Sequence, residues 1–370
     1  MTLETQFKKN VIFIFVAIFH ISACKKDFES SQLSLEKSAK TDLQSKKLMG
    51  LKSDDNLLNA GSLLKLGING HLGDAPYLNV PWAKQIAMLK ERGMTYYRIN
   101  VQTKNDGSAS SAMDLKALQI AADEAGIQLL PMLYLRKLDY NKSEKHNYNF
   151  GKKLGSSFAA KYGKYFVFYN LGNDEELPII YKNKTGMKPE HYNLVKFKAT
   201  AAFLKGMDEG IKENDLDAKT MIGAGWLHFG FLQMCEDYGI KFDRIAYNWY
   251  SDMENAAARA PYFITDITQT LTQLFPDKPI WFAEYNYRYK ATSRTNEIDQ
   301  EDFVKKFTAK CRANPNVKVA LIYELFDEPY KSIQEATYGI IKWKTQYSVW
   351  EDKALSKTFL LNLFNEIKHN

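Results

Sequence analysis

The chain has 370 residues, of which 45% are hydrophobic and 14% aromatic, which is enough apolar material for a large buried core and argues against disorder. Its formal net charge of +7 is modest for this length. The sequence holds no run of lysine and arginine interleaved with aromatic residues of the kind that follows a phosphate backbone. We therefore expect no nucleic acid partner.

Residues 1–23 have the three parts of a signal peptide. Lys8 and Lys9 supply positive charge, residues 11–19 are apolar, and small residues lead up to Cys24. A short membrane helix is the alternative, but the apolar stretch is only about half of the ~20 residues that span a bilayer. Because it ends on cysteine, the pattern resembles a bacterial lipobox. That resemblance implies cleavage before Cys24, lipidation of its thiol, and a membrane-anchored protein of the cell envelope, outside the cytoplasm.

Residues 24–62 are expected to form a flexible tether. They are rich in Ser, Lys, Asp and Leu, and Phe28 is the last aromatic residue before the tether ends. The folded domain is then expected to cover residues 63–370 and to act as a monomer. In an exported protein Cys235 and Cys311 would be either buried free thiols or a distant pair.

Within residues 63–370, short runs suited to buried strands alternate with longer amphipathic stretches. The predicted strands are 66–69, 96–101, 128–134, 166–171, 220–223, 244–248, 280–284 and 319–323. The predicted helices between them include 82–91, 113–125, 150–162, 196–214, 264–274 and 300–313. This alternation predicts a (β/α)8 TIM barrel, whose active site lies at the C-terminal ends of the strands. A doubly wound sheet shares the alternation, but residues 67–70 lack the glycine spacing of a dinucleotide-binding turn.

Carboxyl side chains follow the fourth and the seventh predicted strands. Asn173, Asp174 and Glu175 come after the fourth, and Glu284 ends the seventh, after an apolar run. If the strands close into a barrel, these groups converge on one pocket.

This arrangement resembles the large clan of retaining glycoside hydrolases that share a (β/α)8 barrel, including families that act on xylosides and other glycans. The resemblance covers nearly the whole domain. It implies hydrolysis of O-glycosidic bonds in an oligosaccharide or polysaccharide, a carbohydrate substrate and no cofactor. In the clan the seventh strand ends in a nucleophilic glutamate, which falls here on Glu284, and the fourth strand ends in Asn-Glu. Asn173 would accordingly contact the sugar's 2-hydroxyl.

The fourth strand departs from the clan's pattern, because the residue after Asn173 is Asp174 and a glutamate comes only at Glu175. Three interpretations stay open. Asp174 is the acid/base, a local bulge presents Glu175 instead, or catalysis is lost and the protein is a noncatalytic glycan-binding surface lipoprotein.

Other polar and aromatic residues at strand ends also agree with the clan's pattern. The resemblance implies that they bind substrate: Arg98 at strand two, Tyr247 and Trp249 at strand six, and Tyr323 and Glu324 at strand eight. Arg98, with Tyr247 or Tyr323, is expected to keep Glu284 ionised. The negative charge of Glu284 would in turn raise the pKa of the strand-four acid.

The histidines are few, and two of them have two possible roles. His71 and His228 follow strands one and five, where each is a candidate hydrogen-bond partner of a sugar or a structural residue. No histidines are paired at metal-ligand spacing, so we expect no metal site. The sequence also lacks a Gly-x-Ser-x-Gly elbow and a Walker loop, which disfavours esterase and phosphoryl-transfer functions.

Overall fold

A computed structural model of the chain describes residues 64–109, 114–134, 138–288, 297–332 and 335–356. The predicted signal peptide at residues 1–23, the lipidation site Cys24 and the tether at residues 24–62 lie outside these ranges. Among the described residues, no helix is both long enough and apolar enough to cross a membrane.

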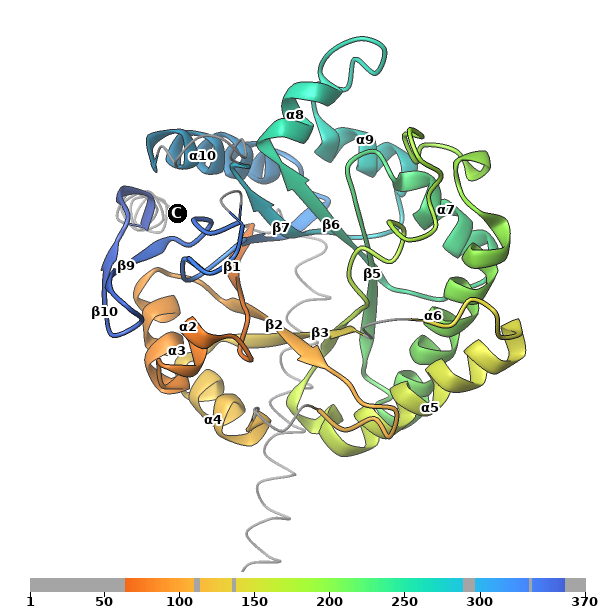
Figure 1. Ribbon diagram of the computed structural model, residues 1–370, viewed down its shortest axis with the longest axis horizontal. Helices are drawn as coiled ribbons and strands as arrows, with labels where there is room; N and C mark the ends of the chain where they lie inside the picture. Colours follow the sequence, from red (N-terminus) through yellow and green to blue (C-terminus); the bar gives the residue numbers. More distant parts are fainter. Residues whose placement is uncertain (1–63, 110–113, 135–137, 289–296, 333–334, 357–370) are drawn as a thin grey trace, which may run out of the picture. The chain divides into compact units, whose positions relative to one another are not determined.

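Eight parallel strands close into a barrel in which each strand pairs with its neighbours in sequence and the first pairs with the eighth (Figure 1). The strands are β1 (Lys65–Gly70), β2 (Tyr96–Gln102), β3 (Gln128–Tyr134), β4 (Phe168–Leu171), β5 (Lys219–Gly225), β6 (Arg244–Tyr250), β7 (Ile280–Asn286) and β8 (Val317–Ile322). The predicted (β/α)8 TIM barrel and all eight predicted strands are confirmed, with ends that differ by at most two residues.

Helices surround the barrel on its outside (Figure 1). The six predicted helices correspond to α3 (Trp82–Glu91), α4 (Leu115–Ala125), α5 (Glu144–Tyr162), α6 (Leu194–Asn214), α9 (Ile267–Leu274) and α10 (Glu297–Ala313). The structure adds α2 (Ala75–Leu78), α7 (Phe229–Asp237), α8 (Ser251–Ala257) and a hairpin of β9 (Ile341–Thr345) with β10 (Val349–Asp352) after the barrel. Cys235 in α7 and Cys311 in α10 are buried free thiols, which is one of the two expected alternatives.

Polar caps fix where several helices begin. The side chains of Asp114, Ser143, Asn193 and Asp266 each accept a hydrogen bond from a backbone N–H in the first turn of α4, α5, α6 and α9. Ser143 explains why α5 begins six residues before its predicted start. The first turns of this helix are polar, so hydrophobic periodicity alone does not reveal them.

The barrel wall separates two apolar clusters. One cluster consists of side chains that point into the interior of the barrel: Tyr96, Leu130, Phe168, Met221, Ala246, Trp281, Ala283, Val319 and Leu321. Outward side chains such as Tyr97 and Ile99 pack against the helices. On β2 the inward series that starts at Tyr96 continues with Arg98 and Asn100, because successive strand residues face opposite sides. Polar residues thus replace apolar ones towards the C-terminal end of the barrel.

Candidate active site

A cavity of about 690 Å³ lies at the C-terminal ends of the strands. We call it the cleft. Six of the residues predicted to form the site line this cleft: His71, Arg98, Asn173, Asp174, Glu284 and Tyr323. Glu175, Tyr247, Trp249 and Glu324 are not part of the lining.

A β-bulge in β7 turns Glu284 into the cleft. Trp281 and Ala283 both face the barrel interior, so strict alternation would turn Glu284 outward, towards the helices. The pairing of β7 with β6 and with β8 slips at this point, and Glu284 faces inward while Tyr285 packs outside. The slip leaves the Ala283 carbonyl off the regular ladder, and it accepts a hydrogen bond from Asn69 Nδ2 at 2.9 Å. Bulges of this kind commonly re-aim a side chain next to an active site.

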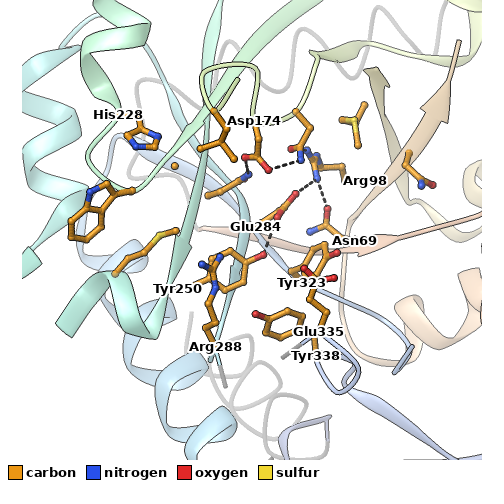
Figure 2. A pocket seen from close by; sticks show the side chains of 18 of the residues that line it. Asn69, Arg98, Asp174, His228, Tyr250, Glu284, Arg288, Tyr323, Glu335 and Tyr338 are labelled. Carbon is orange, nitrogen blue, oxygen red and sulfur yellow. Dashed lines mark hydrogen bonds and ion pairs between the residues drawn. The ribbon is translucent and has the colours of Figure 1, made fainter. Parts of the chain in front are cut away.

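Two donors hold the Glu284 carboxylate. Arg98 Nη1 lies 2.8 Å from Oε1, and the Tyr250 hydroxyl donates to Oε2 at 2.9 Å (Figure 2). Glu284 itself is only 7% exposed. The two donors therefore hold both oxygens of the Glu284 carboxylate in a fixed position at the cleft.

Arg98 joins the two halves of the site. Its Nε donates to Asn170 at 3.0 Å, Nη1 donates to Asn69 at 2.8 Å as well as to Glu284, and Nη2 donates to Asn173 at 2.8 Å. Only 4% of Arg98 is exposed, and all three nitrogens of its guanidinium group donate to protein side chains. It therefore positions the β7 carboxylate and the loop after β4 relative to each other.

Asp174 is the strand-four carboxyl group that faces the cleft. Its Oδ1 accepts a hydrogen bond from Asn248 Nδ2 and its Oδ2 one from Asn173 Nδ2, each at 3.1 Å. Burial, followed by the negative charges of Glu176 and Glu284, raises the pKa of Asp174 to about 8. Asp174 is therefore protonated at neutral pH and can donate a proton.

Glu175 turns away from the cleft. Its side chain lies against Gly172, where an added Cβ would meet Glu175 Cγ at 2.5 Å, and Gly172 has a φ of +73°. Burial, with the charge of Glu176 adding to it, raises the pKa of Glu175 to about 7. The position of the side chain, rather than its acidity, separates Glu175 from Asp174.

Tyr247 and Trp249, the two predicted aromatic contacts on β6, lie on the outer face of the strand, away from the cleft. Tyr247 is fully buried and donates to the Trp226 carbonyl at 2.6 Å, and Trp249 is 1% exposed within the outer core. Asn248 and Tyr250 alternate with them and face the cleft. The expected sugar contacts of Tyr247 and Trp249 do not fit this placement. The tyrosine that donates to Glu284 is Tyr250, in place of the predicted Tyr247 or Tyr323.

His71 lies at the edge of the cleft between two buried carboxylates. Its Nδ1 is 2.9 Å from Glu324 Oε2 and 3.0 Å from Glu328 Oε2. Burial on its own would lower the pKa of His71, but the two carboxylates outweigh it and raise the pKa to about 10. Tyr323 lies beside this group, with its ring centroid 5.3 Å from that of His71. Glu324 is fully buried beneath His71, so its predicted contact with substrate does not fit its placement.

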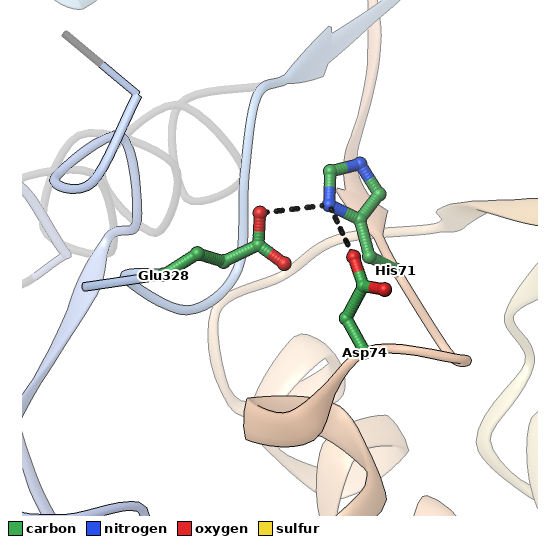
Figure 3. A group of neighbouring side chains, drawn as sticks. All are labelled: His71, Asp74 and Glu328. Atoms are coloured by element: carbon green, nitrogen blue, oxygen red, sulfur yellow. Dashed lines mark hydrogen bonds and ion pairs between the residues drawn. The ribbon is translucent and has the colours of Figure 1, made fainter. Parts of the chain in front are cut away.

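His71, Asp74 and Glu328 have the spacing of a metal site, since one ligand atom from each lies within 4.8 Å of the others (Figure 3). Lys331 already supplies a cation to this group. Its Nζ forms an ion pair with Glu328 and lies 3.2 Å from His71 Nδ1 and 4.0 Å from Asp74. The ammonium group thus balances the negative charge that would attract a metal ion.

The pair of Glu176 and His228 was only half predicted from the sequence: His228 is one of the predicted candidate partners of a sugar, whereas Glu176 has no predicted role. Both residues line the cleft, and His228 Nδ1 lies 3.1 Å from Glu176 Oε1. The run of acidic residues after β4 and the histidine after β5 were visible in the sequence, but nothing in it indicated that the two side chains meet.

No protein-family model matches the sequence, and no curated protein matches it. Solved structures match it at low sequence identity. A family 1 β-glucosidase from Thermotoga maritima is 12% identical, with a TM-score of 0.60 over 82% of this chain and 97% of that one. A virulence factor from Agrobacterium tumefaciens is also 12% identical, with a TM-score of 0.61 over 82% and 97% of the two chains. A family 39 glycoside hydrolase from Bacteroides cellulosilyticus is 14% identical, with a TM-score of 0.58 over 81% of this chain and 63% of that one. At these identities the likeness establishes the barrel fold that the chain shares with them.

Proposed function

We propose that the protein is a glycoside hydrolase that cleaves O-glycosidic bonds with retention of configuration, with Glu284 as nucleophile and Asp174 as acid/base. The observation that carries the proposal is the contrast between two carboxyl groups in one cleft. Glu284 accepts hydrogen bonds from Arg98 and Tyr250, whereas burial raises the pKa of Asp174 to about 8. A carboxyl group whose pKa is raised, in the same cleft as a second carboxyl group held by hydrogen-bond donors, is what the acid/base of a glycosidase requires. The glycoside hydrolases among the structural neighbours support the same reaction class.

In the first step a Glu284 carboxylate oxygen forms a bond to the anomeric carbon. The bond from that carbon to the leaving-group oxygen breaks, and this oxygen takes the Asp174 proton. In the second step the ionised Asp174 removes a proton from water, the water oxygen attacks the anomeric carbon, and the Glu284 ester is released as carboxylate. Asp174 recovers its proton in this step, so no cofactor is consumed.

Asn173 and Arg98 support these steps. Arg98 Nη2 donates to Asn173 Oδ1 at 2.8 Å, which fixes the amide beside Asp174. From this position Asn173 is suited to contact the 2-hydroxyl of the sugar, where hydrogen bonds strengthen as charge develops in the transition state. Tyr323, His71 and Arg98 complete the lining around the reacting sugar.

The test is mass spectrometry of the purified protein after incubation with a panel of 2-deoxy-2-fluoro glycosides, which trap retaining nucleophiles. A covalent adduct on Glu284, absent in Glu284→Gln, would establish the nucleophile and the preferred sugar together. Sugar binding by calorimetry without any adduct or hydrolysis would instead favour the noncatalytic glycan-binding lipoprotein, to which the replacement of glutamate by Asp174 points.

For the N-terminal region we propose, from the sequence pattern alone, lipid anchoring through Cys24 in the cell envelope. Expression of the full chain in bacteria with an alkyne-labelled fatty acid should label the wild type and not Cys24→Ser. Equal labelling of both proteins would contradict the anchor.

A further inference from the structure

Several contacts hold the Glu176 and His228 side chains in place. Glu176 is 0% exposed, and its Oε1 accepts from the Gly225 backbone N–H at 3.0 Å as well as pairing with His228 at 3.1 Å. Gly186 closes the other side of the histidine, because any Cβ there would lie 2.2 Å from His228 Cδ2. Tyr192 fixes this loop by donating its hydroxyl to the Gly186 carbonyl at 2.7 Å. The imidazole is therefore held in one orientation.

The contact with Glu176 also decides which nitrogen of His228 faces a ligand. A carboxylate accepts hydrogen bonds, so it places the imidazole proton on Nδ1. Among the described residues no side chain or backbone group forms a hydrogen bond with Nε2. His228 lines the cleft, so its Nε2 is left as an acceptor for a donor group on a bound molecule.

His228 and Arg98 lie on opposite sides of the two carboxyl groups in the cleft. Figure 2 shows His228 on one side of Asp174 and Glu284, with Arg98 and Asn69 on the other. In the proposed reaction the sugar attacked by Glu284 ends at the oxygen that Asp174 protonates. What continues past that oxygen is the leaving group, and a leaving group on the side of His228 would keep the reacting sugar beside Arg98 and Asn69.

We propose that His228, oriented by Glu176, is the hydroxyl-binding residue of a leaving-group subsite, and that the leaving group is itself a sugar. This inference rests on the proposed function. The histidine acceptor takes a hydrogen bond from a ring hydroxyl. Trp226 lies two residues earlier in the same turn and also lines the cleft, where its indole ring offers an apolar surface to the sugar's C–H groups. A leaving group such as 4-nitrophenol or a simple alcohol has no hydroxyl besides the glycosidic oxygen, so it forms no hydrogen bond with His228.

The experiment compares two substrates that share the reacting sugar, one with a second sugar as leaving group and one with 4-nitrophenol. The reacting sugar is the one identified by the fluoro-glycoside panel. In His228→Ala the ratio of kcat/KM for the disaccharide to kcat/KM for the nitrophenyl glycoside should fall about tenfold, the effect of one lost hydrogen bond. His146→Ala, on the exposed face of α5, is the matched control and should keep the wild-type ratio.

The outcomes separate the two claims. If the wild type hydrolyses both substrates but His228→Ala leaves the ratio unchanged, or lowers both rates equally, the leaving-group subsite is refuted and the glycosidase function stands. If the wild type turns over neither substrate and forms no adduct, the proposed function fails and the subsite with it. Should His228→Ala fail to fold, His228→Leu fills the space without a hydrogen-bond acceptor: a tenfold fall in its ratio supports the subsite, and an unchanged ratio refutes it.

Discussion

Arg98 Nη1 lies 2.8 Å from Oε1 of Glu284, and the two side chains form an ion pair that is almost completely buried. Arg98 is also bonded to three asparagines, so the ion pair belongs to a network that spans β1, β2, β4 and β7. We therefore expect the stability of the fold and the proposed catalysis to depend on the same contacts.

The first prediction concerns this ion pair. Arg98→Met leaves the Glu284 carboxylate buried without its cation, and should lower the free energy of unfolding by roughly 3–5 kcal/mol. In Arg98→Met/Glu284→Gln no uncompensated charge remains, so the double variant should lose about 1–3 kcal/mol less than the sum of the two single losses. Denaturant unfolding of the wild type and the three variants measures the coupling. Strict additivity would show that the two charges do not depend on each other.

The second prediction is an alkaline limit to activity. In the proposed reaction Asp174 must be protonated in the first step. Its pKa is raised to about 8, so kcat/KM should fall as pH rises through about 8. A dinitrophenyl glycoside needs no proton on its leaving group. With this substrate Asp174→Asn should stay active, and its alkaline limb should disappear. If the limb persists in this variant, Asp174 is not the titrating group and Glu175→Gln becomes the next variant to measure.

The third prediction compares two tyrosines of β6. Tyr250→Phe removes a hydrogen bond to the Glu284 carboxylate and should lower kcat/KM about 10- to 100-fold. Tyr247→Phe removes a hydrogen bond outside the cleft, so it should change the free energy of unfolding by about 1 kcal/mol and kcat/KM by no more than about twofold. The reverse order of effects on kcat/KM would place Tyr247, rather than Tyr250, in the site.

The same two tyrosines show what the sequence could and could not predict. Each barrel strand was recognisable as a short apolar run, and the order of strands and helices was enough to predict the barrel. All seven residues of β6 are buried, however, because the strand has the barrel interior on one face and helices on the other. Apolar residues on both faces hide the alternation, so the sequence did not reveal that Asn248 and Tyr250 face inward.

Local backbone geometry determines which carboxyl side chains face the cleft. A bulge after Ala283 directs Glu284 into the cleft, which alternation along the strand would not have predicted. In the loop after β4, Gly172 and Asp174 both have positive φ, at +73° and +53°. These turns present Asp174 and fold Glu175 back, and a run of acidic residues carries no signal that distinguishes the two outcomes.

The fourth prediction concerns the packing of α5 on α6. A Cβ added at Gly206 would lie 2.0 Å from the Tyr148 carbonyl oxygen, a backbone atom that cannot move aside alone. Helix propensity favours alanine over glycine by about 1 kcal/mol, but the steric clash should dominate. Gly206→Ala should therefore destabilise the protein by roughly 1–3 kcal/mol, with a lower Tm in thermal unfolding. Gly73→Ala is the control, since a Cβ there meets no atom within 4 Å. A higher Tm for Gly206→Ala would contradict the close packing.

The last prediction is a pH-dependent contribution of His71 to stability. The pKa of this histidine is raised from 6.5 to about 10 by its contacts with Glu324 and Glu328, which exceed the opposing effect of burial. A raised pKa means that the folded state binds the proton more tightly than the unfolded state, so the stabilisation is fully present below pH 6.5 and is lost as pH rises towards about 10. His71→Gln cannot carry the charge. The difference in Tm between the wild type and His71→Gln should therefore be largest near pH 6 and shrink steadily up to pH 10. A difference independent of pH over this range would mean that the imidazole stabilises the fold by packing and neutral hydrogen bonds, without a positive charge between the two carboxylates.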